Sequence, residues 1–254
     1  MDLGYYILFF LLGIILGEIY NFIGIRLSDD EEKLLSRSHC DKCYHKLNFF
    51  EIIPVFSYIF LGGKCNYCQR KIDIKHPLIE LLTGVLFVFT YYLFGISYEL
   101  LIALGIISLF VIVCVSDLSY LIIPDQVIIF FGIYFMVIQF FRLGLFGTLE
   151  HVFTGLFLFC MMYLIMLIGD KAFQKESLGG GDVKLMFIFG LILDPLLGTF
   201  AIFLSSLIAL PISLILLKKG KGHVIPFGPF LLLALILVFF IGITPQGLLN
   251  LFSF

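Results

Sequence analysis

The sequence predicts an all-α polytopic membrane protein, with about eight transmembrane helices and a small polar insert between the first and the second. Hydrophobic residues make up 61% of the 254 residues and charged residues only 13%, and the mean hydropathy is +1.12. Soluble domains contain about 45–50% apolar and about 25% charged residues. The composition therefore excludes an ordinary soluble domain and indicates that most of the chain lies in a lipid bilayer.

Eight apolar segments account for most of the chain, and a membrane-spanning helix needs about 20 such residues. The segments are residues 3–25, 78–94, 96–116, 126–141, 152–168, 183–193, 196–217 and 225–243. The first segment is long enough to span and has no basic region before it, so no cleavable signal peptide is expected. We divide the chain into a first transmembrane helix (1–27), an insert (28–77) and a membrane core (78–254).

The distribution of lysine and arginine predicts the orientation of these helices. With the N-terminus outside, all 16 basic residues except Arg142 fall on the inner side, as the positive-inside rule requires. Both termini are therefore expected outside. The insert, the 117–125 turn and the 169–182 loop are expected on the cytoplasmic face.

One segment is too short to cross the bilayer. Residues 183–193 would form about 16 Å of helix, against a hydrocarbon core of about 30 Å. If Asp194 and Pro195 mark the outer boundary, Asp182 lies within the thickness of the membrane, and the glycines before it must face protein or water. The alternative is a helix that continues through Pro195 with a kink.

The insert contains two CxxC pairs that predict a metal site. The four cysteines are Cys40, Cys43, Cys65 and Cys68. Two such pairs complete a tetrahedral sulfur site of the kind zinc prefers, and four ligands without an open position indicate a structural ion. The flanking His39 and His45 are alternative ligands. Disulfides or redox-active pairs are the other interpretation, which a cytoplasmic location disfavours.

Acidic residues within the membrane are functional candidates by default. They are Glu18, Glu80, Asp117, Asp125, Asp170 and Asp182. Asp125 follows a proline and precedes an apolar run, so we expect it to be a helix N-cap. Asp117 ends a helix, where a carboxylate opposes the dipole and capping offers no explanation. Asp182 follows three glycines and is either an N-cap or a catalytic acid; the phosphate-binding GxxxxGK[ST] motif does not occur here.

Asp117 and Asp182 are expected on the same side of the membrane at comparable depth, which suggests a catalytic pair. Two close carboxyl groups do not ionise together easily, so one acts as base on a water molecule while the other donates a proton to a peptide carbonyl. Gly179 and Gly181 would keep the backbone beside Asp182 open to a substrate strand. Lys184 either tunes the pair or lies at the membrane interface.

Four stretches together resemble the type IV prepilin peptidases, which are GxGD aspartic proteases. They are "GGGDVKLM" (179–186), "SDLSYLIIPD" (116–125), the insert from "SRSHCDKC" to "KHPLIE" (36–80) and "IPFGPFL" (225–231). The stretches span nearly the whole chain in the order of that family. By position, the resemblance implies that Asp117 and Asp182 are the catalytic acids.

The resemblance also implies substrates, cofactors and location. The expected substrates are type IV prepilins or pseudopilins, whose N-terminal leader is cleaved at the cytoplasmic face of the bacterial cytoplasmic membrane. Many members then N-methylate the new terminus with S-adenosylmethionine, although no glycine-rich nucleotide fingerprint is present here. A structural Zn²⁺ in a cytoplasmic insert and contact with membrane lipid are expected, and nucleic acid is not an expected partner.

Two alternatives remain at this point. A presenilin-like or preflagellin peptidase would share the acid pair, but it would lack the zinc insert and act on other substrates. A transporter or channel without enzymatic activity would use the acids to line an ion path. Transport sites usually lie between repeated halves of the chain, and this sequence has no internal repeat.

Overall fold

The structure is a computed structural model of the chain. It describes residues 2–28, 43, 55, 58, 60–174, 178–218 and 226–252. The chain forms two compact units, Met1–Ile96 and Ser97–Phe254, and each is described by itself.

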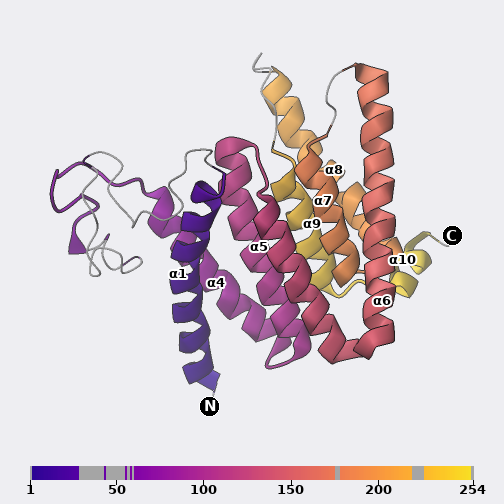
Figure 1. Cartoon of the computed structure of the whole chain (residues 1–254). Coiled ribbons are helices and arrows are strands. Elements are labelled where there is room, and N and C mark those ends of the chain that lie inside the picture. Colours follow the sequence, from indigo (N-terminus) through magenta and orange to yellow (C-terminus); the bar gives the residue numbers. More distant parts are fainter. Residues whose placement is uncertain are drawn as a thin grey trace. The chain divides into compact units, whose positions relative to one another are not determined.

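The first unit is built on two helices, α1 (Asp2–Arg26) and α4 (Lys75–Phe94). The helices pack against each other along small residues (Figure 1). A Cβ atom at Gly13 would lie 2.7 Å from the Cα of Gly84, and one at Gly17 would lie 2.9 Å from the Cα of Glu80. Such close approach of backbones is typical of helix pairs in membranes, where small residues at the interface replace the hydrophobic effect as the driving force.

The second unit is a helical bundle. Its helices are α5 (Tyr98–Tyr120), α6 (Asp125–Phe173), α7 (Gly180–Ile192), α8 (Pro195–Lys218), α9 (Gly228–Ile241) and α10 (Pro245–Phe252). The long α6 is interrupted at Gly144, whose backbone is non-helical (φ 72°, ψ −173°). This break turns α6 into two arms, which Figure 1 shows running in opposite directions. A positive φ of this kind is accessible to glycine at little cost.

Helix α7 is the enclosed helix at the centre of this bundle. In α7, apolar residues occupy all faces and nearly every residue from Asp182 to Ile192 is buried. A helix that is apolar all round is one that is enclosed by other helices. Because α7 packs against α6, α8 and α9, the residue that it carries at its N-terminal end is positioned by the whole bundle.

The predicted fold class is confirmed. All eight predicted apolar segments fall on helices; residues 126–141 and 152–168 are the two arms of α6. Five helices of the described chain are long and apolar enough to cross a membrane, and Gly228–Ile241 is a shorter apolar helix. The short C-terminal α10 was not predicted.

The alternative of one helix continuing through Pro195 is wrong. Helix α7 ends at Ile192, and the next residue, Leu193, is extended (φ −111°, ψ 156°). Pro195 is instead the first residue of α8, a position where its missing N–H costs no helical hydrogen bond. The division into three domains stays a prediction; the compact units separate after Ile96, so that α4 belongs with α1.

Candidate active site

Asp117 lies in the last turn of α5. The helix extends to Tyr120, four residues beyond the predicted end at Ser116, and Asp117 is only 6% exposed. Leu121 adopts a left-handed conformation (φ 57°), and its N–H donates to the Asp117 carbonyl oxygen at 3.0 Å. This turn ends the helix at Tyr120, so Asp117 lies one turn before the helix end.

Asp182 lies in the first turn of α7 and is 7% exposed. The helix starts at Gly180, and its N-cap is Gly179, which has no side chain to cap with. The N–H of Asp182 donates to the Gly179 carbonyl at 3.1 Å. The N-cap interpretation of Asp182 is therefore wrong, because Asp182 is the third residue of the helix.

The third contributor is the N-terminus of α9. Here the backbone N–H of Gly228 donates to Oδ2 of Asp117 at 3.1 Å, across 111 residues of sequence. Residues 225–231 resemble a family motif, but their sequence predicts no role for them. Every residue except proline has a backbone N–H, so this donor cannot be identified from the residue type, and only the packing of α9 against α5 reveals it.

Ile123 connects these three segments. Its side chain is 7% exposed and lies between two glycines. A Cβ at Gly181 would lie 2.9 Å from the Ile123 Cβ, and a Cβ at Gly228 would lie 3.0 Å from its Cδ1. The loop after α5, the start of α7 and the start of α9 thus meet at one end of the unit, the end that carries Asp117 and Asp182.

The three glycines before Asp182 differ in their surroundings. Gly181 is needed for the close approach of Ile123, which is a packing role and differs from the predicted opening to substrate. Gly179 and Gly180 are exposed. A Cβ at Gly180 would meet nothing within 4 Å, and one at Gly179 would lie 3.1 Å from Oδ2 of Asp182. The exposed glycine that lies beside the carboxyl group of Asp182 is therefore Gly179.

Lys184 forms an ion pair with Asp125. Its Nζ lies 2.6 and 2.8 Å from the two carboxylate oxygens of Asp125, and both side chains are about half exposed. Asp125 is the first residue of α6, and Pro124 occupies the N-cap position. The expected N-cap role of Asp125 is therefore wrong. The pair instead joins the segment that follows Asp117 to the helix that carries Asp182.

The opposite end of α7 is held by both arms of α6. Gln139 Nε2 donates to the Leu191 carbonyl at 2.8 Å, and His151 Nδ1 lies 3.1 Å from the Gly190 carbonyl. A carbonyl only accepts, so the Nδ1 of His151 carries the hydrogen. A Cβ on Gly190 would overlap backbone atoms of the second arm.

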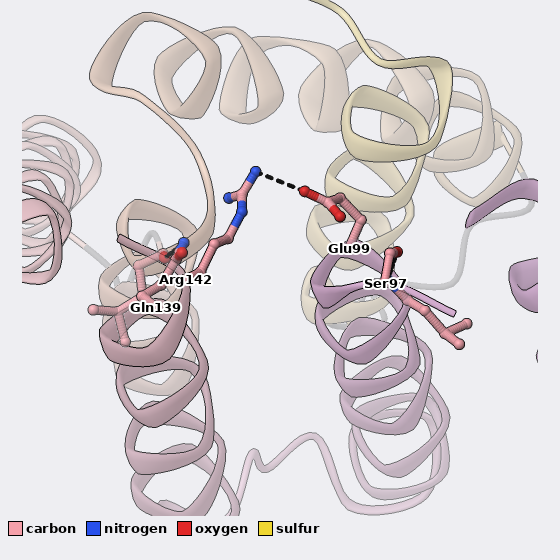
Figure 2. Close-up of polar contacts among 6 residues, drawn as sticks. Ser97, Glu99, Gln139 and Arg142 are labelled. Atoms are coloured by element: carbon pink, nitrogen blue, oxygen red, sulfur yellow. Dashed lines mark hydrogen bonds and ion pairs between the residues drawn. The ribbon is translucent and has the colours of Figure 1, made fainter. Parts of the chain in front are cut away.

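A second polar contact lies near the same end of the bundle. Arg142, on the first arm of α6, forms an ion pair of 3.0 Å with Glu99 at the start of α5, as Figure 2 shows together with Gln139. Arg142 lies on the same arm as Gln139, which binds the C-terminal end of α7, whereas Lys184 lies near the N-terminal end. The predicted position of Arg142 outside the membrane stays a prediction.

In the first unit, two of the other candidate acids lie between α1 and α4. Glu80 is 7% exposed and accepts a hydrogen bond of 2.7 Å from the Val55 N–H. Glu18 follows Gly17, whose position packs against the backbone of Glu80. Glu80 is the sixth residue of α4, which is beyond the first turn where the helix dipole favours a carboxylate.

Three of the four predicted zinc ligands form a cluster. The sulfur atoms of Cys43, Cys65 and Cys68 lie within 4.8 Å of one another, with 4.0 Å between Cys43 and Cys65. A backbone turn shapes the second knuckle: the Cys65 N–H donates to Arg70 O at 2.9 Å. Cys40 lies outside the described residues. These three cysteines could hold a metal ion, and none of them forms a disulfide.

Two family models match consecutive parts of this chain. Residues 11–94 match the bacterial peptidase A24 N-terminal domain and residues 103–214 match the type IV leader peptidase family. A Bacillus subtilis protein named prepilin leader peptidase/N-methyltransferase is 32% identical, over 92% of this chain and 93% of the relative. The chain belongs to the type IV leader peptidase family.

Two further members with the same name are similar to the chain. The Myxococcus xanthus protein is 33% identical over 84% of this chain and 64% of its own length. The Neisseria gonorrhoeae protein is 32% identical over 82% of this chain and 74% of its own length. No solved structure matches the chain significantly.

The two family matches divide the chain where the structure does. The first match ends at residue 94 and the second begins at residue 103, and the compact units separate between Ile96 and Ser97. The cysteine cluster belongs to the first match. In this member of the type IV leader peptidase family, both Asp117 and Asp182 fall within the second match, whereas Gly228 lies beyond it.

Proposed function

We propose that this protein is a membrane aspartic endopeptidase that removes the N-terminal leader of type IV prepilins or pseudopilins. The names of its relatives support this substrate class. The observation that carries the proposal is that two buried acids, Asp117 from α5 and Asp182 from α7, lie at the end of the second unit where Ile123 packs against both Gly181 and Gly228. Buried carboxyl groups from different helices are costly in a membrane and are retained for function.

The chemistry follows from two carboxyl groups that share one proton. The ionised carboxylate takes a proton from water as the water oxygen attacks the scissile carbonyl carbon, and the protonated carboxyl donates to the carbonyl oxygen. Collapse of the tetrahedral intermediate breaks the C–N bond; the leaving nitrogen takes the proton that the first carboxyl group removed from water, and a hydroxyl proton of the intermediate returns to the second carboxylate, which restores the pair. The protein supplies position and protons, and the exposed backbone of Gly179 and Gly180 offers an approach to Asp182.

The decisive experiment is cleavage of a purified prepilin by the full-length protein in lipid nanodiscs. We expect Asp117→Asn and Asp182→Asn each to lower kcat/KM by about 1,000-fold or more, because removing one member of a cooperating pair removes most of its effect. Asp194→Asn, the same substitution at the exposed residue after α7, is the matched control and should be fully active.

Each outcome separates the proposal from its alternatives. Normal cleavage by either Asn variant would contradict the assignment of the pair. Cleavage of other membrane substrates but not of prepilins would favour a presenilin-like or preflagellin peptidase. Absence of any proteolysis, together with Asp-dependent ion flux in the same vesicles, would favour a transporter.

We further propose that the insert binds one structural Zn²⁺ through Cys40, Cys43, Cys65 and Cys68. Zinc–sulfur bonds of about 2.3 Å place tetrahedral sulfur atoms about 3.8 Å apart, close to the 4.0 Å between Cys43 and Cys65. Metal analysis should find about one zinc per chain, and Cys65→Ser should lose it with a lowered Tm. Cys160→Ser, in α6, should keep it. Folded, active protein without metal would contradict the site.

The relatives' names also support N-methylation of the new N-terminal residue, with S-adenosylmethionine as the methyl donor. The test is the intact mass of the cleaved pilin with and without this donor. We expect a product heavier by one methyl group only when the donor is present. A product whose mass never changes would limit this protein to peptidase activity.

We also propose that both termini lie outside and that the acid pair faces the cytoplasm. The support is the charge bias, with Arg142 alone among the basic residues at the outer side. Labelling intact cells with an impermeant maleimide should modify Arg142→Cys strongly and Lys171→Cys only after permeabilisation. The reverse pattern would overturn the orientation but leave the peptidase proposal intact.

A further inference from the structure

The start of α9 is aimed at one catalytic carboxyl group. Gly228 is the first residue of this 14-residue helix and is buried. Its N–H donates to Oδ2 of Asp117 at 3.1 Å. The first N–H groups of a helix have no partner within the helix, so this donor is free to serve another group, and Asp117 receives it.

The position of Asp117 explains why such a donor matters. In the last turn of α5 the helix dipole is negative, and a carboxylate there is disfavoured. Asp182 lies in the first turn of α7, where the dipole favours a negative charge. The helix dipoles alone would therefore favour an ionised Asp182 over an ionised Asp117. The N–H at the start of α9 opposes this preference by stabilising the ionised form of Asp117, since a hydrogen bond to an ionised acceptor is about twice as strong as a neutral one.

The absence of a side chain at residue 228 is equally specific. A Cβ there would lie 3.0 Å from Oδ2 of Asp117, 3.0 Å from Cδ1 of Ile123 and 3.0 Å from Cγ1 of Val113. Three neighbours at this distance, two of them buried core atoms, leave little room for adjustment. Only glycine therefore brings the backbone donor to the carboxylate without displacing it.

We propose that Gly228 is a positioning residue that holds Asp117 in its ionised form and in a fixed orientation. Asp117 then accepts the proton of the attacking water, and Asp182, which cannot easily ionise beside it, donates its proton to the scissile carbonyl oxygen. This inference rests on the proposed peptidase function and assigns the two acids their separate roles within it.

The cleanest test replaces the amide of residue 228 by an ester, which removes the N–H and adds no side-chain atom. The full-length protein in nanodiscs should show kcat lower by about 10-fold to 100-fold, since bonds to charged groups are worth about 1.5–3 kcal/mol. We expect KM within about 2-fold and a Tm lowered no more than in the control, which also loses one backbone hydrogen bond. The matched control is an ester at Phe230, whose N–H donates to Phe227 at the same helix end; it should retain wild-type kcat.

A second variant tests the space at this position. Gly228→Ala keeps the N–H but introduces the Cβ, and we expect a comparable loss of kcat because Asp117 or Ile123 must move. Gly132→Ala, where a Cβ meets nothing within 4 Å, is the control and should be active. Equal kcat for Gly228→Ala and Gly132→Ala would contradict the packing argument.

Infrared difference spectroscopy tests the charge of Asp117 without any turnover. Subtracting the Asp117→Asn spectrum from that of the wild type at neutral pH should reveal a carboxylate band for Asp117. In the ester-228 protein that band should be replaced by a protonated carboxyl band. A protonated Asp117 in the wild type, or no change in the ester protein, would overturn this inference even if cleavage is normal. Failure of the wild type to cleave prepilins would instead refute the proposed function, and the spectra would still decide the role of Gly228.

Discussion

At its N-terminal end, α7 presents exposed residues around Asp182, whereas at its C-terminal end it is enclosed by both arms of α6. At the N-terminal end Gly180 and Lys184 are exposed, and Lys184 forms an ion pair with Asp125, which is itself half exposed. At the C-terminal end, the last carbonyl groups accept hydrogen bonds from Gln139 and His151. The same short helix is thus open at one end and fixed at the other.

The enclosure of the C-terminal end explains the difference. Helix α7 has 13 residues, about 20 Å of helix, and its last residues are buried in the bundle. Carbonyl groups at a buried helix end find no water, and the protein itself must supply their partners. The fixed end gives the open end a rigid support. We therefore expect changes at the C-terminal end to lower stability first, and changes at the N-terminal end to lower catalysis first.

The largest effect is expected from Gly190→Ala. A Cβ there would overlap backbone atoms of Gly155, and backbone cannot rotate away as a flexible side chain can. We expect a loss of about 3 kcal/mol or more in unfolding free energy, measured by denaturation in detergent, with loss of cleavage. Gly132→Ala adds the same atom where nothing lies within 4 Å and should be neutral or slightly stabilising. Equal stability of the two variants would show that the C-terminal end is not tightly packed.

The sequence was sufficient to find the open end. Asp182 follows three glycines and precedes an apolar run, and Asp117 interrupts another apolar run. A carboxyl group in an apolar segment has a high energetic cost, so the sequence alone identifies both acids as functional candidates. The helical segments could be found because membrane helices must be continuous and apolar.

The fixed end could not be found in the same way. Gln139 and His151 lie on different arms of α6, and each meets α7 only because Gly144 reverses the chain. Their partners are backbone carbonyls, which every residue has. The donor of Gly228 is hidden for the same reason. Interactions with backbone groups depend on the register of helix packing, which hydropathy does not encode, and the exact helix ends near Asp117 and Asp125 were missed for that reason.

A smaller effect is expected from Gln139→Met. This substitution keeps the shape of the side chain but removes the donor to the Leu191 carbonyl, so a buried acceptor loses its partner. We expect a loss of about 1 kcal/mol in unfolding free energy, typical of hydrogen bonds between membrane helices. We expect kcat to fall by less than about 3-fold, because the lost bond lies at the end of α7 away from Asp182.

The control for Gln139 is Gln126→Met, at an exposed position near the start of α6, which should leave stability unchanged. His151→Ala adds a second probe from the other arm, and the double variant should show coupling with Gln139→Met, because the two side chains bind carbonyl groups of adjacent residues. A strongly reduced kcat without any loss of stability in Gln139→Met would contradict the division between the two ends.

The smallest effect on stability, and the sharpest test of the open end, concerns the ion pair of Lys184 with Asp125. Exposed pairs contribute about 0–1 kcal/mol, so Lys184→Met and Asp125→Asn should leave Tm nearly unchanged. The pair joins the segment after Asp117 to the helix of Asp182, and loosening that connection should lower kcat by about 2- to 5-fold, with the same loss when salt screens the wild type. The charge-swapped protein, Lys184→Asp with Asp125→Lys, should recover most of the activity, because the attraction depends on opposite charges and not on which helix carries which. A swap that is no better than the single variants would mean that Lys184 acts on substrate directly, and the open end would then be a binding surface as well as a catalytic one.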